Sequence, residues 1–182
     1  VFVPFGDADA LAAAVDDRTA AVVLETIQGE SGVVCPPDGY LRRVREVTRE
    51  HGCLLWVDEV QTGIGRCGQW LTSVADGLEP DLVTLAKGLG NGIPIGACLA
   101  IGAAGELLTP GSHGSTFAGN PIAAAAGLAV LGVIESEGLL AHSRSMGDYL
   151  SRRVLAIGDG QVVGVRGRGL LLGIELAADI AP

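Results

Sequence analysis

Residues 54–61 read LLWVDEVQ, and residues 82–87 read LVTLAK. Both segments are short apolar runs typical of buried strands, and they end near a charged side chain, Asp58 in the first and Lys87 in the second. The separation, 87 − 58 = 29 residues, is about one β-α-β unit. Because the carboxyl ends of neighbouring parallel strands meet at one edge of a sheet, where open α/β folds bind ligands, the two side chains are predicted to share a site.

Strand and helix patterns alternate along the rest of the chain. The run at 20–26 is apolar throughout, which predicts a strand covered on both faces. Strands are predicted at residues 20–26, 53–58, 82–85 and 96–101. Helices are predicted at 7–15 with Asp7 as cap, from Asp38 as cap to 51, and at 69–75. This order favours parallel pairing with right-handed crossovers, an α/β fold.

The C-terminal part of the chain follows a different pattern. Asn120-Pro121 predicts the start of a helix that runs to about residue 137. A second helix at 139–156 and a hairpin of strands at 161–165 and 170–176 follow. We therefore place a change of domain in this helical region.

Composition excludes several classes of function. The net charge of −9 argues against nucleic acid or an anionic membrane as partner. No apolar run reaches the roughly 18–20 residues of a membrane span. The four cysteines have neither a C-x-x-C pair nor metal-ligand spacing, so no metal site is predicted and the thiols are interpreted as reduced, as in a cytoplasmic protein. The chain begins with Val rather than Met, so we interpret it as a piece of a longer protein.

Lys87 is the only lysine in the chain, beside eleven arginines. Its presence suggests amine chemistry that arginine cannot perform. A lysine amine can bond covalently to a carbonyl carbon, and a nearby carboxylate can keep a pyridine nitrogen protonated; pyridoxal phosphate enzymes use both groups. A salt bridge, or two solvated strand ends, is the alternative for Asp58 and Lys87.

Two nucleotide-binding patterns are disfavoured. Residues 63–68, GIGRCG, match G-x-G-x-x-G, but four residues separate them from the preceding strand, whereas a dinucleotide site needs glycines at the turn itself. The apolar-Asp-Glu strand resembles that of a P-loop ATPase. However, Gly88 follows the only lysine, where a P-loop needs Ser or Thr.

Three motifs carry a family resemblance: DEVQTGIGR at 58–66, TLAKGL at 84–89, and HGSTF at 113–117 followed by GNP at 119–121. Together they resemble the class III aminotransferases of the ornithine and acetylornithine type, over the whole chain. The resemblance implies the fold type I of pyridoxal-phosphate-dependent transferases. Residues 1–138 would form part of the cofactor-binding large domain, with a mainly parallel sheet. Residues 139–182 would form the linking helix and first strands of a smaller α+β C-terminal domain.

The resemblance also implies roles around the cofactor, pyridoxal 5′-phosphate. Lys87 would bind it covalently, and Asp58 would pair with its ring nitrogen. Val60 would pack on a face of the ring, and Gln61 would approach the phenolic oxygen.

Further implied roles concern substrate and partner. Thr116 would bind the cofactor phosphate of the neighbouring subunit, so the enzyme would be a homodimer with shared active sites. Ser115 would lie beside the substrate. Glu30 would pair with a substrate-binding arginine of the C-terminal domain. Arg166 and Arg168 are interpreted instead as structural residues near the domain junction.

The function implied is transfer of the terminal amino group of N-acetylornithine to 2-oxoglutarate, a step of arginine biosynthesis. The segments at 94–98 and 110–117 are most similar to family members that act on N-acetylornithine. Ornithine, succinylornithine, 4-aminobutyrate or a diamine remain alternative amino donors. A non-catalytic fragment that binds no cofactor by itself is the alternative from another class.

Overall fold

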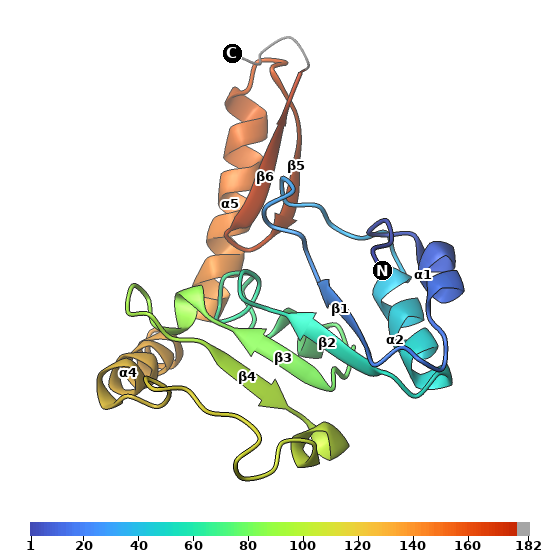
Figure 1. Ribbon diagram of the computed structural model, residues 1–182. Coiled ribbons are helices and arrows are strands. Elements are labelled where there is room, and N and C mark those ends of the chain that lie inside the picture. The colour runs from blue at the N-terminus through green and yellow to red at the C-terminus, as the bar shows by residue number, and fades with distance from the viewer. Residues whose placement is uncertain (178–182) are drawn as a thin grey trace.

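The computed structural model describes residues 1–177, and its main feature is a four-stranded sheet in the order β1-β2-β3-β4 (Figure 1). The strands are β1 (Ala21–Glu25), β2 (Leu54–Asp58), β3 (Leu82–Leu85) and β4 (Ala97–Ala100). β1 and β2 pair in parallel, as do β2 and β3, whereas β4 is antiparallel to β3. The predicted α/β class and the parallel pairing of the first three strands are confirmed.

The core lies on one face of this sheet. Leu55, Val57 and Val83 are fully buried there. Leu55 and Val57 pack in one cluster with α1 (Ala8–Ala14) and α2 (Tyr40–Glu50), whose Val44 and Val47 are also buried. Val83 packs in a separate cluster with Leu85 and Leu89. Each such side chain contributes about 1.5–3 kcal/mol through removal from water. This packing fixes the strand ends in space.

The opposite face is only partly covered in this chain, which corrects the prediction that the first strand is covered on both faces. Val23 is 56 % exposed, and Trp56 beside it is half-buried, donating a hydrogen bond to Thr84 Oγ1 at 3.1 Å. Burial therefore alternates along β2 and β3, although most of their residues are apolar.

Two of the predicted helix N-caps, Asp7 and Asn120, are confirmed, and a third, Asp38, is wrong. Asp7 accepts a hydrogen bond from the Ala10 N–H at 2.8 Å, and Asn120 caps α4 in the same way. Asp38 does not cap α2. Gly39, in the left-handed region at φ 83°, stands at that position and makes no side-chain cap. The chain turns into the helix one residue later than predicted because only glycine adopts this conformation at little cost.

The C-terminal part forms two helices and a hairpin. These are α4 (Pro121–Ser136), α5 (Leu139–Ile157), β5 (Val162–Arg168) and β6 (Leu171–Leu176), the two strands pairing antiparallel in a sheet of their own. α5 packs closely against the turn of the hairpin. There is no room for a side chain at Gly147, because a Cβ there would come within 2.0 Å of the Gly169 carbonyl oxygen. The division at residue 138 stays a prediction, and residues 178–182 of the predicted second unit lie outside the described residues.

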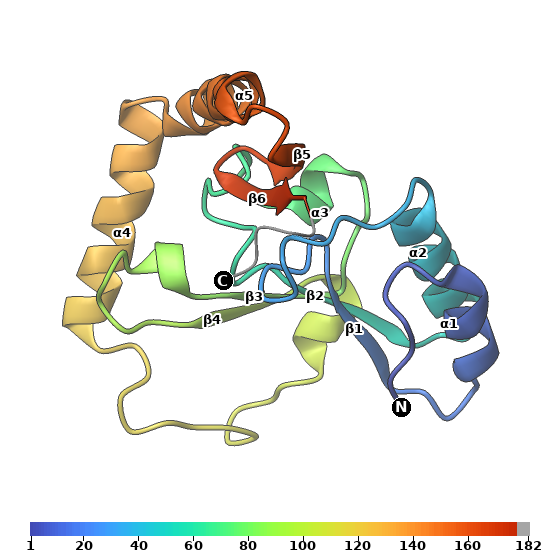
Figure 2. The same cartoon turned by 90° about the horizontal axis from the view of Figure 1, so that it is seen from above.

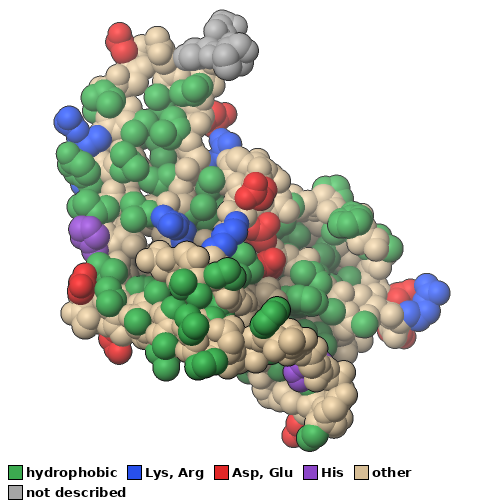
Figure 3. Space-filling model, turned by 60° about the vertical axis from the view of Figure 1, so that its left-hand side comes forward, with side chains coloured by type: hydrophobic (Ala, Val, Ile, Leu, Met, Phe, Trp, Pro, Cys, Tyr) green, Lys and Arg blue, Asp and Glu red, His purple; other side chains and the backbone are tan. Residues whose placement is uncertain are grey.

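α4 is apolar on nearly all sides, yet only Ala123, Gly127 and Ile134 are buried. Ile122 and Leu128 are each more than 70 % exposed. Hydrophobic side chains spread over the face that α4 and α5 form (Figure 3). Within the described residues no single helix combines the length and hydropathy of a membrane span, although α4 and α5 would meet that test as a pair bent by 68°.

Candidate active site

Three charged residues lie at the carboxyl edge of the parallel strands. Glu25 ends β1 and stands opposite Asp58, which ends β2. Asp58 stands opposite Thr84 of β3, three residues before Lys87. The predicted placement of Asp58 and Lys87 at one edge of the sheet is therefore confirmed, because they follow neighbouring parallel strands. Their sharing of one site stays a prediction.

Asp58 is held by the chain that follows it. Its Oδ1 accepts a hydrogen bond from the Val60 N–H at 2.9 Å, an Asx-type turn of the kind aspartate favours. This bond fixes the direction of the half-buried carboxylate, and it also fixes Val60.

Lys87 begins the short 3₁₀ helix η1 (Lys87–Leu89) that follows β3. Its φ of 40° lies in the left-handed region, where a non-glycine residue costs about 1–3 kcal/mol, and such strain clusters at functional sites. Its amine lies 3.9 Å from Glu30 Oε1, and the side chain is 55 % exposed. The strained backbone thus carries an accessible primary amine.

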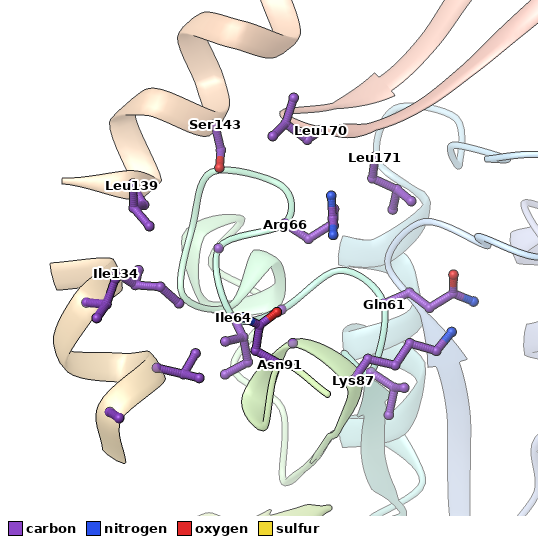
Figure 4. A pocket seen from close by; sticks show the side chains of 17 residues that line it. Gln61, Ile64, Arg66, Lys87, Asn91, Ile134, Leu139, Ser143, Leu170 and Leu171 are labelled. Atoms are coloured by element: carbon purple, nitrogen blue, oxygen red, sulfur yellow. The ribbon is translucent and has the colours of Figure 1, made fainter. Parts of the chain in front are cut away.

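Glu30 and Gln61 join Lys87. Gln61 Nε2 donates to the same Glu30 Oε1 at 3.4 Å, and Figure 4 shows the ends of the Gln61 and Lys87 side chains next to each other. The Gln61 amide lies against Gly29, where a Cβ would approach its oxygen within 2.3 Å. Three of the predicted site residues are therefore brought together.

A cavity of about 600 Å³ adjoins this group. Val60, Gln61 and Lys87 line it, and apolar side chains of α4, α5 and β6 form its other wall (Figure 4). Arg66 and Asn91 also line it, and sequence reasoning did not single out either. Asp58 does not line this cavity. It borders a second one, of about 680 Å³, together with Glu25 and Gln28.

Glu25 is the site residue that the sequence analysis missed. Burial raises the pKa of its carboxyl above the ordinary 4.5, and Asp58 and Glu30 raise it further, against a hydrogen bond from the Gly29 N–H and the charge of Lys87. Glu25 thus lies within electrostatic reach of two other carboxylates and of the Lys87 amine. The sequence did carry a signal for Glu25: it is an acid near the end of the apolar run 20–26, and parallel pairing places it opposite Asp58.

Ser115 and Thr116 are not brought to this edge. Both are exposed and belong to the segment 107–119, all of which is exposed. That segment connects the short helix η2 (Gly102–Glu106) with α4 and runs on the far side of the sheet from the β5-β6 hairpin (Figure 2). Neither residue lines the cavity beside Lys87.

Arg166 and Arg168 join the hairpin to the loop that follows β1 and to the end of the helix Thr72–Ala75, in agreement with their structural interpretation. Arg168 donates to both oxygens of Asp76, at 2.7 and 2.8 Å, and this pairing raises the pKa of the Arg168 guanidinium. Arg166 Nε donates to the carbonyl oxygens of Gly32 and Val33.

Comparison with known proteins identifies the family. The model of the class-III aminotransferases matches residues 6–181. The chain belongs to this family. Acetylornithine aminotransferase of Mycobacterium tuberculosis is 61 % identical over 176 residues, which are 97 % of this chain and 44 % of that protein. The enzyme of the same name from Streptomyces coelicolor is 56 % identical over 180 residues. This class-III chain therefore spans less than half the length of the curated relatives it matches.

Solved structures of the family have the same fold. Ornithine aminotransferase of Toxoplasma gondii, described with partial occupancy of PLP at its active site, matches with a TM-score of 0.90 and 38 % identity, over 97 % of this chain and 43 % of its own. N-acetylornithine aminotransferase of Stenotrophomonas maltophilia matches with a TM-score of 0.88 and 39 % identity, over 100 % and 48 %.

Proposed function

We propose that the complete protein is a pyridoxal-phosphate-dependent aminotransferase that transfers the terminal amino group of N-acetylornithine to 2-oxoglutarate. The observation that carries this proposal is the shared edge of two parallel strands, where Asp58 and the strained, accessible Lys87 follow adjacent strands. Membership of the class-III family and up to 61 % identity to acetylornithine aminotransferases support the reaction and the donor.

The residues at this edge fit the cofactor. A primary amine and a carboxylate held by a backbone N–H lie at the same strand edge and suit the cofactor's aldehyde and its ring nitrogen, although Lys87 lines the cavity of about 600 Å³ and Asp58 the one of about 680 Å³. Lys87 would hold the aldehyde carbon, Asp58 the ring nitrogen and Gln61 the phenolic oxygen, with Val60 against the ring. When bound, the cofactor supplies an electron sink for the carbon that loses its proton.

The side chains then have separate tasks. Asp58 keeps a proton on the ring nitrogen. The Lys87 amine would remove the proton from the donor carbon as a general base and, in the second half-reaction, would deliver a proton to the acceptor carbon as a general acid. Glu30, in contact with Lys87 and Gln61, would exchange these neighbours for a substrate-binding arginine and so distinguish the two substrates.

The proposal includes a homodimer with shared active sites in the cytoplasm. The exposed segment 107–119 supports this assembly, because its Thr116 and Ser115 are free to reach a second copy. Thr116 would hold the cofactor phosphate of the partner copy, and Ser115 would lie beside the substrate. The exposed apolar surface of α4 also favours burial in a larger assembly.

A substrate panel tests the proposal. The complete protein with pyridoxal phosphate and 2-oxoglutarate is assayed for glutamate with N-acetylornithine, ornithine, succinylornithine, 4-aminobutyrate and a diamine as donors. The highest kcat/KM is expected for N-acetylornithine. A higher value for another donor would reassign the substrate, and no glutamate from any donor would overturn the aminotransferase. The 182-residue chain with the cofactor alone tests whether this piece binds it.

A further inference from the structure

Glu59, the residue directly after Asp58, is 1 % exposed and accepts five hydrogen bonds. Oε2 accepts from the hydroxyls of Thr62 and Thr72, at 2.8 and 2.7 Å, and from the Thr72 N–H at 2.9 Å. Oε1 accepts from the N–H and hydroxyl of Ser73, at 2.7 and 2.6 Å. All three donor residues are fully buried. No task in the proposed reaction accounts for this carboxylate.

The bonds extend to all three parallel strands. Thr26, which follows β1, lies with its hydroxyl 2.6 Å from the Thr72 hydroxyl. Because the Thr72 proton is already donated to Glu59, Thr26 is the donor in that bond. The Glu59 N–H donates to the carbonyl oxygen of Thr84 in β3 at 3.0 Å. Glu59 therefore ties together the carboxyl ends of β1, β2 and β3.

Stability alone does not explain a buried carboxylate. Bonds to an ionic acceptor offset the cost of removing it from water, but an apolar replacement of similar volume is often as stable or more so. Such a network instead fixes the positions of the groups that it joins. Glu59 anchors the turn that follows β2, in which its own carbonyl accepts from the Gly63 N–H at 2.9 Å, and this turn carries Val60 and Gln61.

We propose that Glu59 is a positioning residue of the active site, which holds Asp58, Val60 and Gln61 in the arrangement that the cofactor needs while touching neither cofactor nor substrate. Asp58 points to the half-exposed face of the sheet, whereas Glu59 is buried below it beside α3 (Thr72–Ala75). The inference rests on the proposed function, since it assigns the group that these residues receive.

The test uses the complete enzyme with Glu59→Gln. In this variant one oxygen becomes an NH₂ group that must face the N–H of Thr72 or of Ser73. Hydroxyls can turn to accept a hydrogen bond, but a backbone N–H cannot, so the turn must shift. A displacement of about 1 Å can lower a rate by about 10²-fold. We expect kcat and the affinity of the apo-enzyme for pyridoxal phosphate to fall at least about tenfold, with an altered cofactor absorption spectrum.

Asp81→Asn is the matched control. Asp81 accepts hydrogen bonds from Arg45 and the Leu55 N–H at the opposite, amino edge of the same strands. Both variants should unfold at a lower temperature, but Asp81→Asn should keep the wild-type spectrum, cofactor affinity and kcat. Thr72→Ser, which retains every bond to Glu59 and loses only a buried methyl group, should keep the wild-type spectrum, cofactor affinity and kcat.

Equal cofactor affinity and spectra in Glu59→Gln and Asp81→Asn would overturn the positioning role. If Glu59→Gln does not fold, Ser73→Ala decides, since it removes one hydroxyl and keeps both N–H donors. A weaker cofactor affinity than in Asp81→Asn supports the role, and an unchanged affinity overturns it. Wild-type enzyme that gives no cofactor band would instead refute the proposed function.

Discussion

At the amino edge of the four-stranded sheet, Asp81 accepts two hydrogen bonds from Arg45, at 2.7 and 3.1 Å, and one from the Leu55 N–H at 2.7 Å. At the carboxyl edge, Glu30 lies 3.9 Å from the amine of Lys87, and Glu25 is within electrostatic reach of Asp58, Glu30 and Lys87. The amino edge thus pairs its partly buried acid with an adjacent cation. At the carboxyl edge the acidic side chains outnumber the basic ones. This arrangement is expected where a ligand completes the charge balance.

Removing the acid from the carboxyl edge should give the largest effect. Asp58→Asn in the complete enzyme is expected to lower kcat by roughly 10²–10⁴-fold, because the amide cannot hold a proton on the ring nitrogen as the carboxylate does. The free energy of unfolding should change little, since the bond from the Val60 N–H can be kept by the amide oxygen. Steady-state kinetics and urea unfolding check both parts, and near-normal turnover would remove Asp58 from the mechanism.

At the amino edge we predict the reverse: a substitution there should lower stability and leave the turnover rate nearly unchanged. Asp81→Asn weakens a bidentate ion pair that is about a fifth exposed, so the free energy of unfolding should fall by about 1–2 kcal/mol. The kcat of folded enzyme should stay within about twofold of wild type. Large loss of turnover in a folded Asp81→Asn enzyme would show that the two edges are not separable.

The pH dependence of stability sharpens the difference. Burial alone would raise the pKa of Asp81, but hydrogen bonds from Arg45 and the Leu55 N–H outweigh it and hold the pKa below 3.8. A lowered pKa stabilises the fold above pH 3.8, and this contribution is lost as the pH falls through the folded-state pKa. Urea unfolding across acidic pH should show this loss in wild type and not in Asp81→Asn.

The smallest predicted effect concerns Glu25, whose pKa is shifted in the opposite direction. Because burial and two neighbouring acids raise the pKa above 4.5, ionisation costs stability as the pH rises from 4.5 through the folded-state pKa. Glu25→Gln should remove that loss and make the cofactor-free enzyme slightly more stable than wild type at neutral pH. A variant less stable at pH 7 and unchanged at pH 4 would contradict the assignment.

Local sequence patterns predicted the strands and their pairing well. β3 was predicted to the residue, and β1, β2 and β4 within two residues at each end, because apolar runs and glycine turns are local signals. The cap of α2 was wrong, since the conformation of Gly39 depends on how the preceding loop returns to the sheet.

The site itself was predictable only in part. Asp58 and Lys87 could be placed at one edge because their strands are consecutive and parallel. Glu25 and Glu59 were not predicted, because the importance of Glu25 comes from strand register and four of the five hydrogen bonds to Glu59 come from donors 13 or 14 residues away, which no local pattern reveals. Thr116 and Ser115 were assigned by resemblance alone, and their predicted roles depend on a second copy of the chain.

Covalent trapping tests the central claim most directly. Complete enzyme is mixed with pyridoxal phosphate, reduced with borohydride, digested and analysed by mass spectrometry, with Lys87→Ala treated in parallel. We predict that the reduced cofactor is recovered on the peptide that contains Lys87, and that the folded Lys87→Ala enzyme carries no label and turns over no substrate. Label on another residue of the wild type, or turnover by Lys87→Ala, would contradict the assignment of this strand edge as the active site.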